Sequence, residues 1–175
     1  MRKGDNEEKI RWLQATLNQY EGRLLRYLKR MVPEQFARDV VQDAFVKLWQ
    51  EDPERLKGHE APWLFRVCRN RALDILKKEG RMSPFDSDQS QAPDDPVATV
   101  ERKQETTRVL QVIAELPQKK QDVLRLKFQE GLSYKEISQV TGLTESYVGV
   151  LIHEGIQFIR ERMKDDQPSI QGGAQ

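Results

Sequence analysis

Residues 132–163 read LSYKEISQVTGLTESYVGVLIHEGIQFIRERM. Ser133 is followed three residues later by Glu136, which is the capping-box pattern that begins a helix. The segment TGL, residues 141–143, predicts a tight turn after this short helix, and Thr144 is a suitable N-cap for the next one. Two helices around a glycine turn predict a helix-turn-helix, a motif typical of DNA-binding domains and also found in generic helical hairpins.

The helix after this turn has a distinct apolar face and a polar face. Apolar residues at helical spacing predict that Val148, Ile152, Ile156 and Ile159 face the core. If the helix reads DNA, base contacts would come from the opposite face: Ser146, Tyr147, Val150, His153 and Gln157. Residues 143–158 contain no lysine or arginine. Phosphate contacts would therefore come from the helix N-terminus at Thr144 and from Lys135, Arg160, Arg162 or Lys164. We expect a shallow salt dependence for this domain alone.

The rest of the chain is also helical by periodicity. Apolar spacing predicts helices over residues 7–32, 34–50, 62–80, 100–116 and 118–130. Proline and glycine mark most of their ends: Pro33, Pro62, Gly80, Pro117 and Gly131. Residues 51–61, EDPERLKGHEA, are predicted to form a turn.

The all-α chain therefore divides into two small helical domains, the second with the helix-turn-helix. Residues 81–96, RMSPFDSDQSQAPDDP, are polar and acidic and have little to bury. We expect domains at 1–80 and 98–165, a flexible linker at 81–97 and a disordered tail at 166–175.

Composition excludes several classes of protein. Among 175 residues no apolar run approaches the roughly 18 that span a bilayer, and the start MRKGDNEEKIRW is not a signal peptide. We expect a cytoplasmic protein without membrane insertion. Cys68 is the only cysteine, so no internal disulfide forms, and a core position is favoured over a redox role. His59 and His153 lack ligand-spaced partners, and no phosphate-binding loop or nucleophile motif occurs, so we expect no metal, no cofactor and no enzymatic activity.

The net charge of +1 averages two segments of opposite sign. Residues 62–81 contain six basic and two acidic residues, a local charge of +4. Residues 82–105 contain two basic and six acidic residues, a local charge of −4. This asymmetry is more informative than the net charge.

A helical wheel for residues 63–79 separates an apolar face from a basic one. Leu64, Phe65, Cys68, Ala72, Ile75 and Leu76 face inward. Asn70 lies at the centre of the outward face, where cations could hold phosphates while the amide reads a base edge. The candidate DNA-binding residues here are Trp63, Arg66, Arg69, Asn70, Lys77, Lys78 and Arg81. Trp63 could stack on an unpaired base, although a core tryptophan that closes the bundle is the favoured interpretation.

The outward face of the predicted helix 34–50 is acidic and includes one apolar residue. Asp39, Gln42 and Asp43 would repel nucleic acid, and Val46 lies among them. An acidic face with an exposed apolar residue suits a protein partner, and a plain solvated face is the alternative.

Three blocks of sequence resemble one known family when they are taken together. They are AxDVVQDAFxxLW from Ala37, WLFRVCRNRALDILKK from Trp63 and LPxxxxxVLRLKFQEGLSYKEISQVTGL from Leu116. In this combination and order the chain resembles the extracytoplasmic-function group of bacterial sigma factors, over nearly its whole length.

The resemblance implies a transcription initiation subunit with two helical domains. The first would bind the clamp helices of core RNA polymerase and open the minus-ten promoter element, and the second would read minus-thirty-five and contact the flap. The polymerase-binding block contains Asp39, Val40, Gln42, Asp43 and Val46. Asn70 falls at the asparagine associated with a flipped non-template base. The acidic linker would follow the polymerase channel, and an anti-sigma factor is a further implied partner.

Two departures from the family pattern affect the expected contacts. The loop Lys57–Trp63 is about two residues shorter than usual, and Gly149, Leu151 and Glu154 stand where relatives commonly have basic residues. The alternative function is a one-component helix-turn-helix regulator that binds DNA without joining polymerase. The face of residues 39–49 separates the two, because only a sigma factor must bind core polymerase through it.

Overall fold

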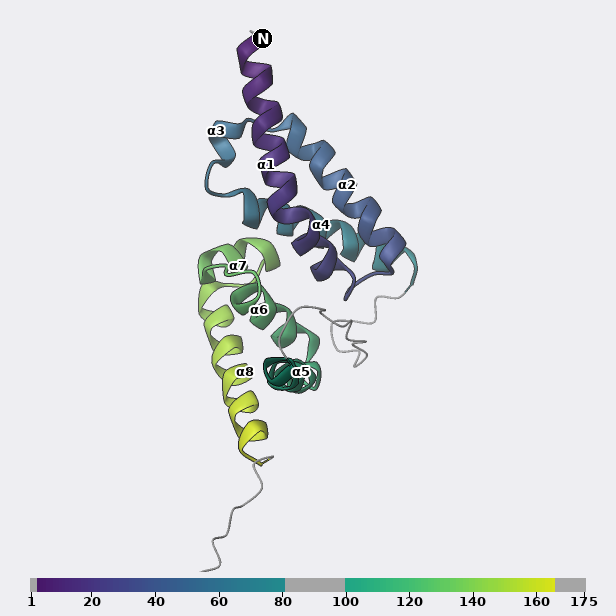
Figure 1. Ribbon diagram of the computed structural model, residues 1–175. Helices are drawn as coiled ribbons and strands as arrows, with labels where there is room; N and C mark the ends of the chain where they lie inside the picture. Colours follow the sequence, from purple (N-terminus) through teal and green to yellow (C-terminus); the bar gives the residue numbers. More distant parts are fainter. Residues whose placement is uncertain (1–2, 81–99, 166–175) are drawn as a thin grey trace, which may run out of the picture.

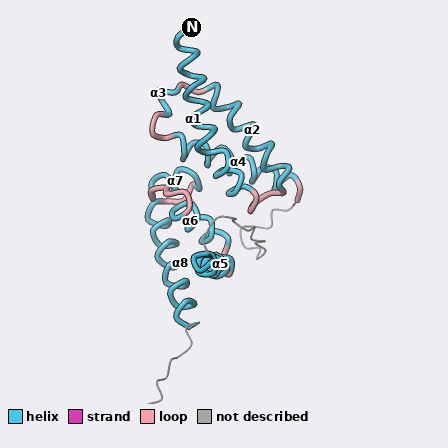
Figure 2. Tube along the Cα trace, viewed as in Figure 1, coloured by secondary structure: helices cyan, strands magenta, loops and turns pink. Residues whose placement is uncertain are grey.

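The computed structural model describes residues 3–80 and 100–165. Within these ranges the chain forms eight helices and no strand, which confirms the all-α expectation. Figures 1 and 2 show two groups of helices, α1 to α4 and α5 to α8, one stacked on the other. The predicted linker, 81–97, and the predicted tail, 166–175, lie outside the described residues.

The first group consists of α1 (Lys3–Leu28), α2 (Glu34–Gln50), α3 (Pro53–Leu56) and α4 (Glu60–Lys78). The first helix ends earlier than predicted, because the chain turns over residues 29–32, before Pro33. The amides of Lys29 and Val32 there donate to the carbonyls of Leu25 and Leu28.

The segment predicted as a turn before α4 contains the short helix α3. The Asp52 side chain accepts a hydrogen bond from the Glu54 amide at 3.0 Å, and Pro53 occupies the first helical position. Both features begin helices. The sequence prediction missed α3 because it treated the whole stretch as turn-forming.

The core of the first group lies between α1, α2 and α4. Leu24, Leu28, Leu48, Leu64 and Phe65 are fully buried there. The Tyr27 and Phe65 rings meet edge to face, with their centroids 5.3 Å apart. The inward face predicted for α4 is confirmed, since Leu64, Phe65, Cys68 and Ala72 are all buried, while Ile75 and Leu76 pack against the core.

The second group consists of α5 (Val100–Ala114), α6 (Gln118–Phe128), α7 (Tyr134–Thr141) and α8 (Glu145–Asp165). The helix-turn-helix is formed by α7 and α8, and its predicted caps are confirmed. The Ser133 hydroxyl accepts from the Glu136 amide at 3.2 Å, while the Glu136 carboxylate accepts from the Ser133 amide at 2.7 Å. Gly142 has a φ of 76°, which explains glycine in the turn. The Thr144 hydroxyl accepts from the Tyr147 amide at 3.2 Å.

The helices α6 and α8 pack closely at a glycine. A Cβ on Gly155 would lie 2.7 Å from Leu124 Cδ1, so the two backbones can approach only because this side chain is missing. Val148 and Ile152 are buried, as predicted, and Ile156 and Ile159 are half-buried.

The two groups also pack against each other. Figure 1 shows α7 directly beneath α4, and buried side chains of both groups form one continuous hydrophobic cluster. From the first group it includes Tyr27 and Phe65, and from the second Leu126, Leu132 and Ile137. The expectation of two domains did not include this contact.

Candidate functional site

The polar face of α8 is exposed, as the helical wheel predicted. Ser146, Tyr147, Val150, His153 and Gln157 are all accessible on its surface, and so is the capping residue Thr144. Tyr147 and Val150 are 42% and 48% exposed, which is high for side chains of this size and polarity. The face could contact base edges, and that role stays a prediction.

Part of the positive charge around this face comes from α6. The Lys119 ammonium lies 5.9 Å from the centre of the Tyr147 ring, and Lys120 forms a 2.9 Å ion pair with Glu154. Lys127 lies 5.2 Å from the Tyr134 ring. Of the cations predicted from the sequence, Lys135 is exposed on α7, and Arg160, Arg162 and Lys164 are exposed on α8. The contribution of α6 was not predicted, because it depends on how α6 packs beside α8.

The family departures on α8 have local explanations. Leu151 is only 3% exposed and belongs to the hydrophobic cluster, where a basic side chain would lose its hydration. Glu154 is paired with Lys120. Gly149 lies beside the Tyr134 ring, with room for a Cβ at ordinary contact distance.

The outward basic stripe of α4 is present, with one exception. Arg66, Asn70, Lys77 and Lys78 are exposed. Arg69, by contrast, is 6% exposed and turned toward the second group of helices. Arg81 lies outside the described residues.

Trp63 lies at the boundary between the two groups. It is half-buried against the hydrophobic cluster and also lines a cavity of about 560 Å³. On the α4 side this cavity is lined by Pro62 and Arg66 as well. On the other side its lining residues come from α7 and its cap: Ser133, Lys135, Glu136 and Gln139.

The Asp122 carboxylate on α6 joins the two groups. It accepts hydrogen bonds from the Tyr27 hydroxyl at 2.8 Å and from Arg69 Nε at 3.0 Å. Burial, reinforced by the negative charge of Asp122, raises the pKa of Tyr27 well above its usual value. Burial by itself would lower the pKa of Arg69, but the Asp122 carboxylate and the Tyr27 side chain together outweigh it, so the pKa is raised. Arg69 therefore stays charged.

Further polar contacts join the two groups. Arg23 on α1 donates from Nε to the Glu130 carboxylate and from Nη2 to the Glu130 carbonyl, both at 2.8 Å. Arg30 donates to the Gln129 side chain at 2.8 Å. We call these contacts, with those of Asp122, the junction. None of these contacts was predicted from the sequence. Arg69 and Asp122 are 53 positions apart, and the residues of each other pair are about a hundred positions apart.

Arg125 is also buried at the junction, but less favourably than Arg69. It is 5% exposed, and among the described residues its Nε has no hydrogen-bond acceptor. Burial and repulsion from Arg30 lower its pKa to about 10, although Asp122 partly opposes this.

The outward face of α2 carries the acidic residues that were predicted there. Asp39, Gln42 and Asp43 are exposed, and Val46 is 57% exposed among them. Val40 is only 2% exposed, so it supports the face from within the core. Asp43 lies 3.9 Å from Arg71, a loose ion pair between α2 and α4.

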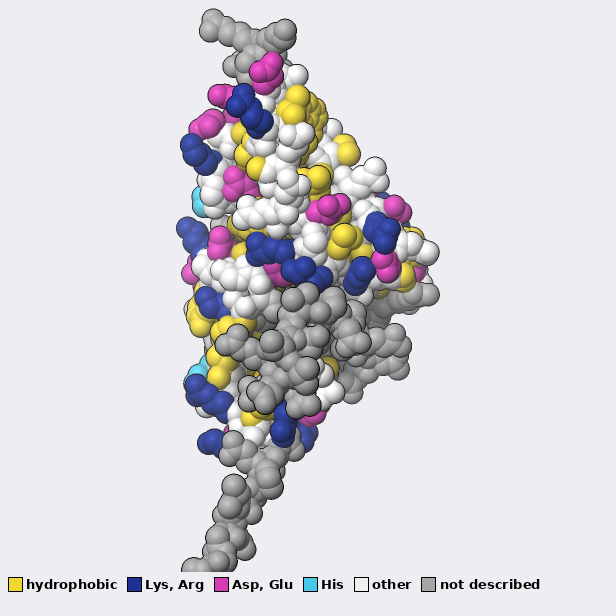
Figure 3. All heavy atoms as spheres, viewed as in Figure 1, with side chains coloured by type: hydrophobic (Ala, Val, Ile, Leu, Met, Phe, Trp, Pro, Cys, Tyr) yellow, Lys and Arg dark blue, Asp and Glu magenta, His cyan; other side chains and the backbone are white. Residues whose placement is uncertain are grey.

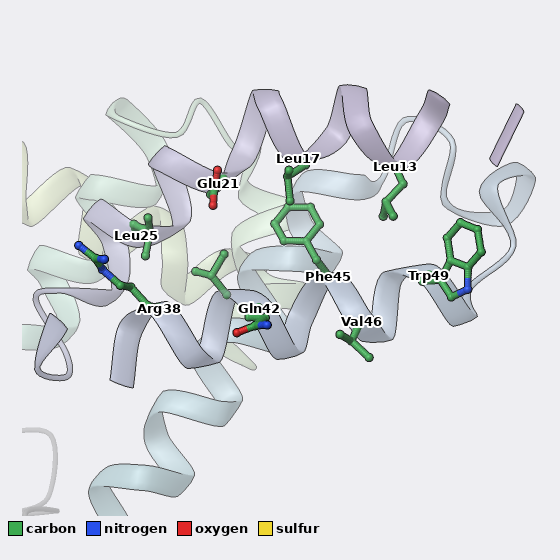
Figure 4. A pocket seen from close by; sticks show the side chains of 10 residues that line it. Leu13, Leu17, Glu21, Leu25, Arg38, Gln42, Phe45, Val46 and Trp49 are labelled. Atoms are coloured by element: carbon green, nitrogen blue, oxygen red, sulfur yellow. The ribbon is translucent and has the colours of Figure 1, made fainter. Parts of the chain in front are cut away.

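An apolar groove runs beside this face, between α1 and α2. Its volume is about 560 Å³. In Figure 4, Leu13 and Leu17 of α1 point toward Phe45 of α2, Trp49 lies at one end and Arg38 at the other. Hydrophobic side chains gather along this face in Figure 3. Val46 and Trp49 were noted from the sequence, whereas the contribution of α1 was not.

The described ranges 3–80 and 100–165 hold neither a membrane-spanning helix nor a cluster of metal-ligating side chains. They contain no helix both long and apolar enough to cross a membrane. They also contain no group of three or more His, Cys, Asp or Glu side chains placed to hold a metal ion.

Comparison with known proteins assigns each group of helices to a conserved region of the sigma-70 family. Residues 16–82 match Sigma-70 region 2, and residues 106–159 match Sigma-70, region 4. The RNA polymerase sigma-H factor of Pseudomonas aeruginosa is 30% identical over 69% of this chain and 70% of its own length. The ECF RNA polymerase sigma factor RpoE of Cereibacter sphaeroides is 29% identical over 73% of this chain and 72% of its own.

A solved structure supports the fold independently. CnrH, in complex with the cytosolic domain of CnrY, superimposes with a TM-score of 0.57 and 23% identity over 89% of this chain and 90% of that one.

A chain that carries region 2 and region 4 in this order is a sigma factor, a non-enzymatic subunit that directs the initiation of transcription. Within the sigma-70 family, this chain belongs to the extracytoplasmic-function, or ECF, group. It therefore binds core RNA polymerase and promoter DNA.

Proposed function

We propose that this sigma factor opens its promoter by capturing single-stranded minus-ten DNA on the exposed stripe of α4. The observation that carries the proposal is Asn70, an exposed amide between the cations Arg66 and Lys77 on one helical face. Cations at this spacing can hold phosphates while the amide bonds to a base edge. Trp63, half-buried at the start of the helix, offers part of a ring for stacking.

Capture of a flipped base favours melting without nucleotide hydrolysis. Unstacking and unpairing a base costs a few kcal/mol, and binding of the extruded base offsets part of that cost. Each captured base thus shifts the equilibrium toward open DNA. The region 2 match over residues 16–82 supports this role and gives the one-component regulator no support, since such a protein needs no polymerase-binding domain.

We assign the other partners to the remaining surfaces. The helix-turn-helix reads minus-thirty-five DNA through Ser146, Tyr147, Val150, His153 and Gln157, with phosphates held by Thr144 and Lys135. The acidic face of α2 binds the polymerase clamp helices, and region 4 binds the flap. Because core polymerase acts in the cytoplasm, this protein acts there too. CnrH was solved with the cytosolic domain of CnrY, which supports an anti-sigma factor as a partner here too.

The test is Asn70→Ala in holoenzyme reconstituted with core polymerase. In vitro transcription of a genomic fragment library first supplies a promoter. Permanganate footprinting should then show about tenfold less opening, equivalent to about 1.4 kcal/mol, because one base-edge contact is lost. Duplex promoter binding should change by less than about twofold.

The matched control is Asp74→Ala, one helical turn further along the same exposed face. It removes an acidic side chain and no base-reading amide, so opening should not fall. Equal opening by Asn70→Ala and the unmutated protein would sink the proposal.

A further inference from the structure

We propose that the helix-turn-helix selects thymine by its methyl group, which contacts Tyr147 and Val150 of α8. Lys119 of α6 is the positioning residue that holds the Tyr147 ring for this contact. The inference rests on the proposed role of α8 as the reader of minus-thirty-five DNA. It adds the base that the exposed face selects and a residue on another helix that supports the selection.

The exposed face of α8 has an apolar part made by two residues. Tyr147 is 42% exposed and Val150 is 48% exposed. Residues three positions apart on a helix lie on the same face, so both side chains are presented to the same region of a bound duplex. The other members of the face, Ser146, His153 and Gln157, are polar. The apolar group that a base pair presents in the major groove is the thymine methyl, so this pair fits thymine.

The backbone of Tyr147 is fixed at the start of α8. The Thr144 hydroxyl accepts a hydrogen bond from the Tyr147 amide at 3.2 Å, and the Thr144 carbonyl accepts one from the Val148 amide at 2.9 Å. Val148 is fully buried in the hydrophobic cluster. The freedom that remains to Tyr147 is rotation about its two side-chain torsions.

Lys119 restricts this rotation from a neighbouring helix. It is the second residue of α6, is half-buried, and places its ammonium over the Tyr147 ring, 5.9 Å from the ring centre. A cation over the face of an aromatic ring attracts it. The ring is thereby held toward α6, in one of the orientations that an exposed tyrosine would otherwise sample.

The cation is well placed because α6 and α8 are fixed to each other. Leu124 of α6 packs against Gly155, where an added Cβ would lie 2.7 Å from Cδ1 of the leucine. Lys120, next to Lys119 in sequence, forms a 2.9 Å ion pair with Glu154 of α8. The position of Lys119 beside α8 is therefore set by helix packing.

A second pair of lysine and tyrosine on these helices has a different environment. Lys127 of α6 lies 5.2 Å from the centre of the Tyr134 ring and donates to the Leu132 carbonyl at 3.3 Å. The Tyr134 ring also lies beside Gly149 of α8, at ordinary contact distance for a Cβ. Both members of this pair are thus joined to the protein itself. Lys127→Met is therefore the matched control for Lys119→Met, since it makes the same charge change on the same helix.

The experiment replaces thymine by deoxyuridine, which removes one methyl group and leaves the protein unchanged. Holoenzyme is reconstituted with core polymerase, and in vitro transcription of a genomic fragment library supplies the promoter. Each thymine of the minus-thirty-five element, on either strand, is replaced in turn, and the concentration for half-maximal promoter binding is measured. At least one replacement should weaken binding about fourfold, the effect expected from the loss of one buried methyl group.

Protein variants assign this discrimination to residues. Tyr147→Ala and Val150→Ala should each reduce the ratio between thymine and deoxyuridine below about twofold, because the methyl group loses part of its apolar contact. Tyr147→Phe should keep the ratio, since the ring remains. Lys119→Met should reduce it, and Lys119→Arg should restore it, because a guanidinium also binds a ring face. The control Lys127→Met should keep it.

Salt dependence separates positioning from contact with phosphate. A lysine that binds a phosphate contributes about 0.9 to the slope of log affinity against log salt. Lys119→Met should leave this slope unchanged. A slope shallower by about 0.9 would make Lys119 a phosphate ligand and overturn its positioning role.

Binding that no deoxyuridine replacement weakens would overturn the proposal, and so would an element without an A·T pair. Full discrimination by Tyr147→Ala would overturn the assignment of the contact, and full discrimination by Lys119→Met would overturn the positioning role. Scrambling the whole minus-thirty-five element tests the proposed function separately. Unchanged binding to the scrambled promoter would refute the reading role of α8, whereas weakened binding with no effect of the methyl groups would refute thymine selection alone.

Discussion

Cys68 shows how burial sets the chemistry of a single residue. Its side chain is fully buried on the inner face of α4, and burial raises the pKa of the thiol from 9.0 to about 12, with a small opposing effect of Lys47. The core position favoured from the sequence is therefore confirmed. The thiolate is the reactive form, so a rise of about three pKa units lowers its population about a thousandfold at neutral pH.

We predict that alkylation of Cys68 by iodoacetamide at pH 8 is at least about a hundredfold slower in the native chain than in urea. Because the folded pKa lies above the unfolded value, this group favours the folded state fully below pH 9, and the contribution is lost as pH rises toward 12. Mass spectrometry of quenched samples gives the rates. Equal rates in the two conditions would contradict the buried position.

Two glycines on α8 differ in how closely neighbouring side chains approach them. A Cβ on Gly155 would meet Leu124 at 2.7, 3.2 and 3.2 Å, and Leu124 is itself only 1% exposed and cannot move aside freely. A Cβ on Gly149 would meet the Tyr134 ring at 3.5 Å, an ordinary contact.

We predict that Gly155→Ala lowers the free energy of unfolding by about 1 kcal/mol, because overpacking exceeds the gain in helix propensity. Gly149→Ala should raise it by about 0.5–1 kcal/mol through propensity alone. Chemical denaturation followed by circular dichroism measures both. Opposite signs are the expected result, and stabilisation by Gly155→Ala would show that α6 and α8 pack less closely than described.

At the scale of elements, the helices follow from local signals and their faces from periodicity. Ser133 with Glu136 and Thr144 predicted the two helix starts of the helix-turn-helix, because capping involves only neighbouring residues. The inward positions of α4 and α8 followed from spacing in the same way. The predictions were wrong at the end of α1 and at α3, where short-range turns compete with helix.

The outward face of α2 gives a prediction about its partner. We expect Asp43→Arg to weaken binding to core polymerase at least about tenfold, because it reverses the charge of an exposed acidic face and places two cations near each other at Arg71. A quantitative pull-down with core enzyme measures the change.

Glu7→Arg is the control for this prediction, since it makes the same charge reversal at an exposed position of α1, away from the acidic face of α2. Its binding should match that of the parent. An equal loss in both variants would assign the effect to net charge, against a specific role of α2.

At the scale of the whole molecule, what could not be predicted is the contact between the groups. On the helical wheel, Arg69 flanks the basic stripe and nothing beside it in sequence indicates a buried partner. Its carboxylate partner lies 53 positions away, and Tyr27 is 95 positions from the same Asp122. A single sequence carries no signal for such pairs, because the positions are joined only by the packing of the complete chain.

The same limit applies to the groove and to the charge beside α8. The helical repeat of α1 includes the apolar residues Leu13 and Leu17 and was recognised from the sequence. Their position in a groove beside α2 depends on tertiary packing and was not predicted. Lys119 and Lys127 belong to a helix with no predicted role in binding DNA, and only its position beside the helix-turn-helix brings them near Tyr147 and Tyr134.

The junction also makes buried charges of the two groups depend on each other. The Asp122 carboxylate and the Arg69 guanidinium are both buried and lie 3.0 Å apart. Removing either side chain would leave the other as a buried charge without this ion-pair partner, which costs about 3–5 kcal/mol. A single substitution at either position would therefore weaken the contact between the groups by more than the loss of one hydrogen bond.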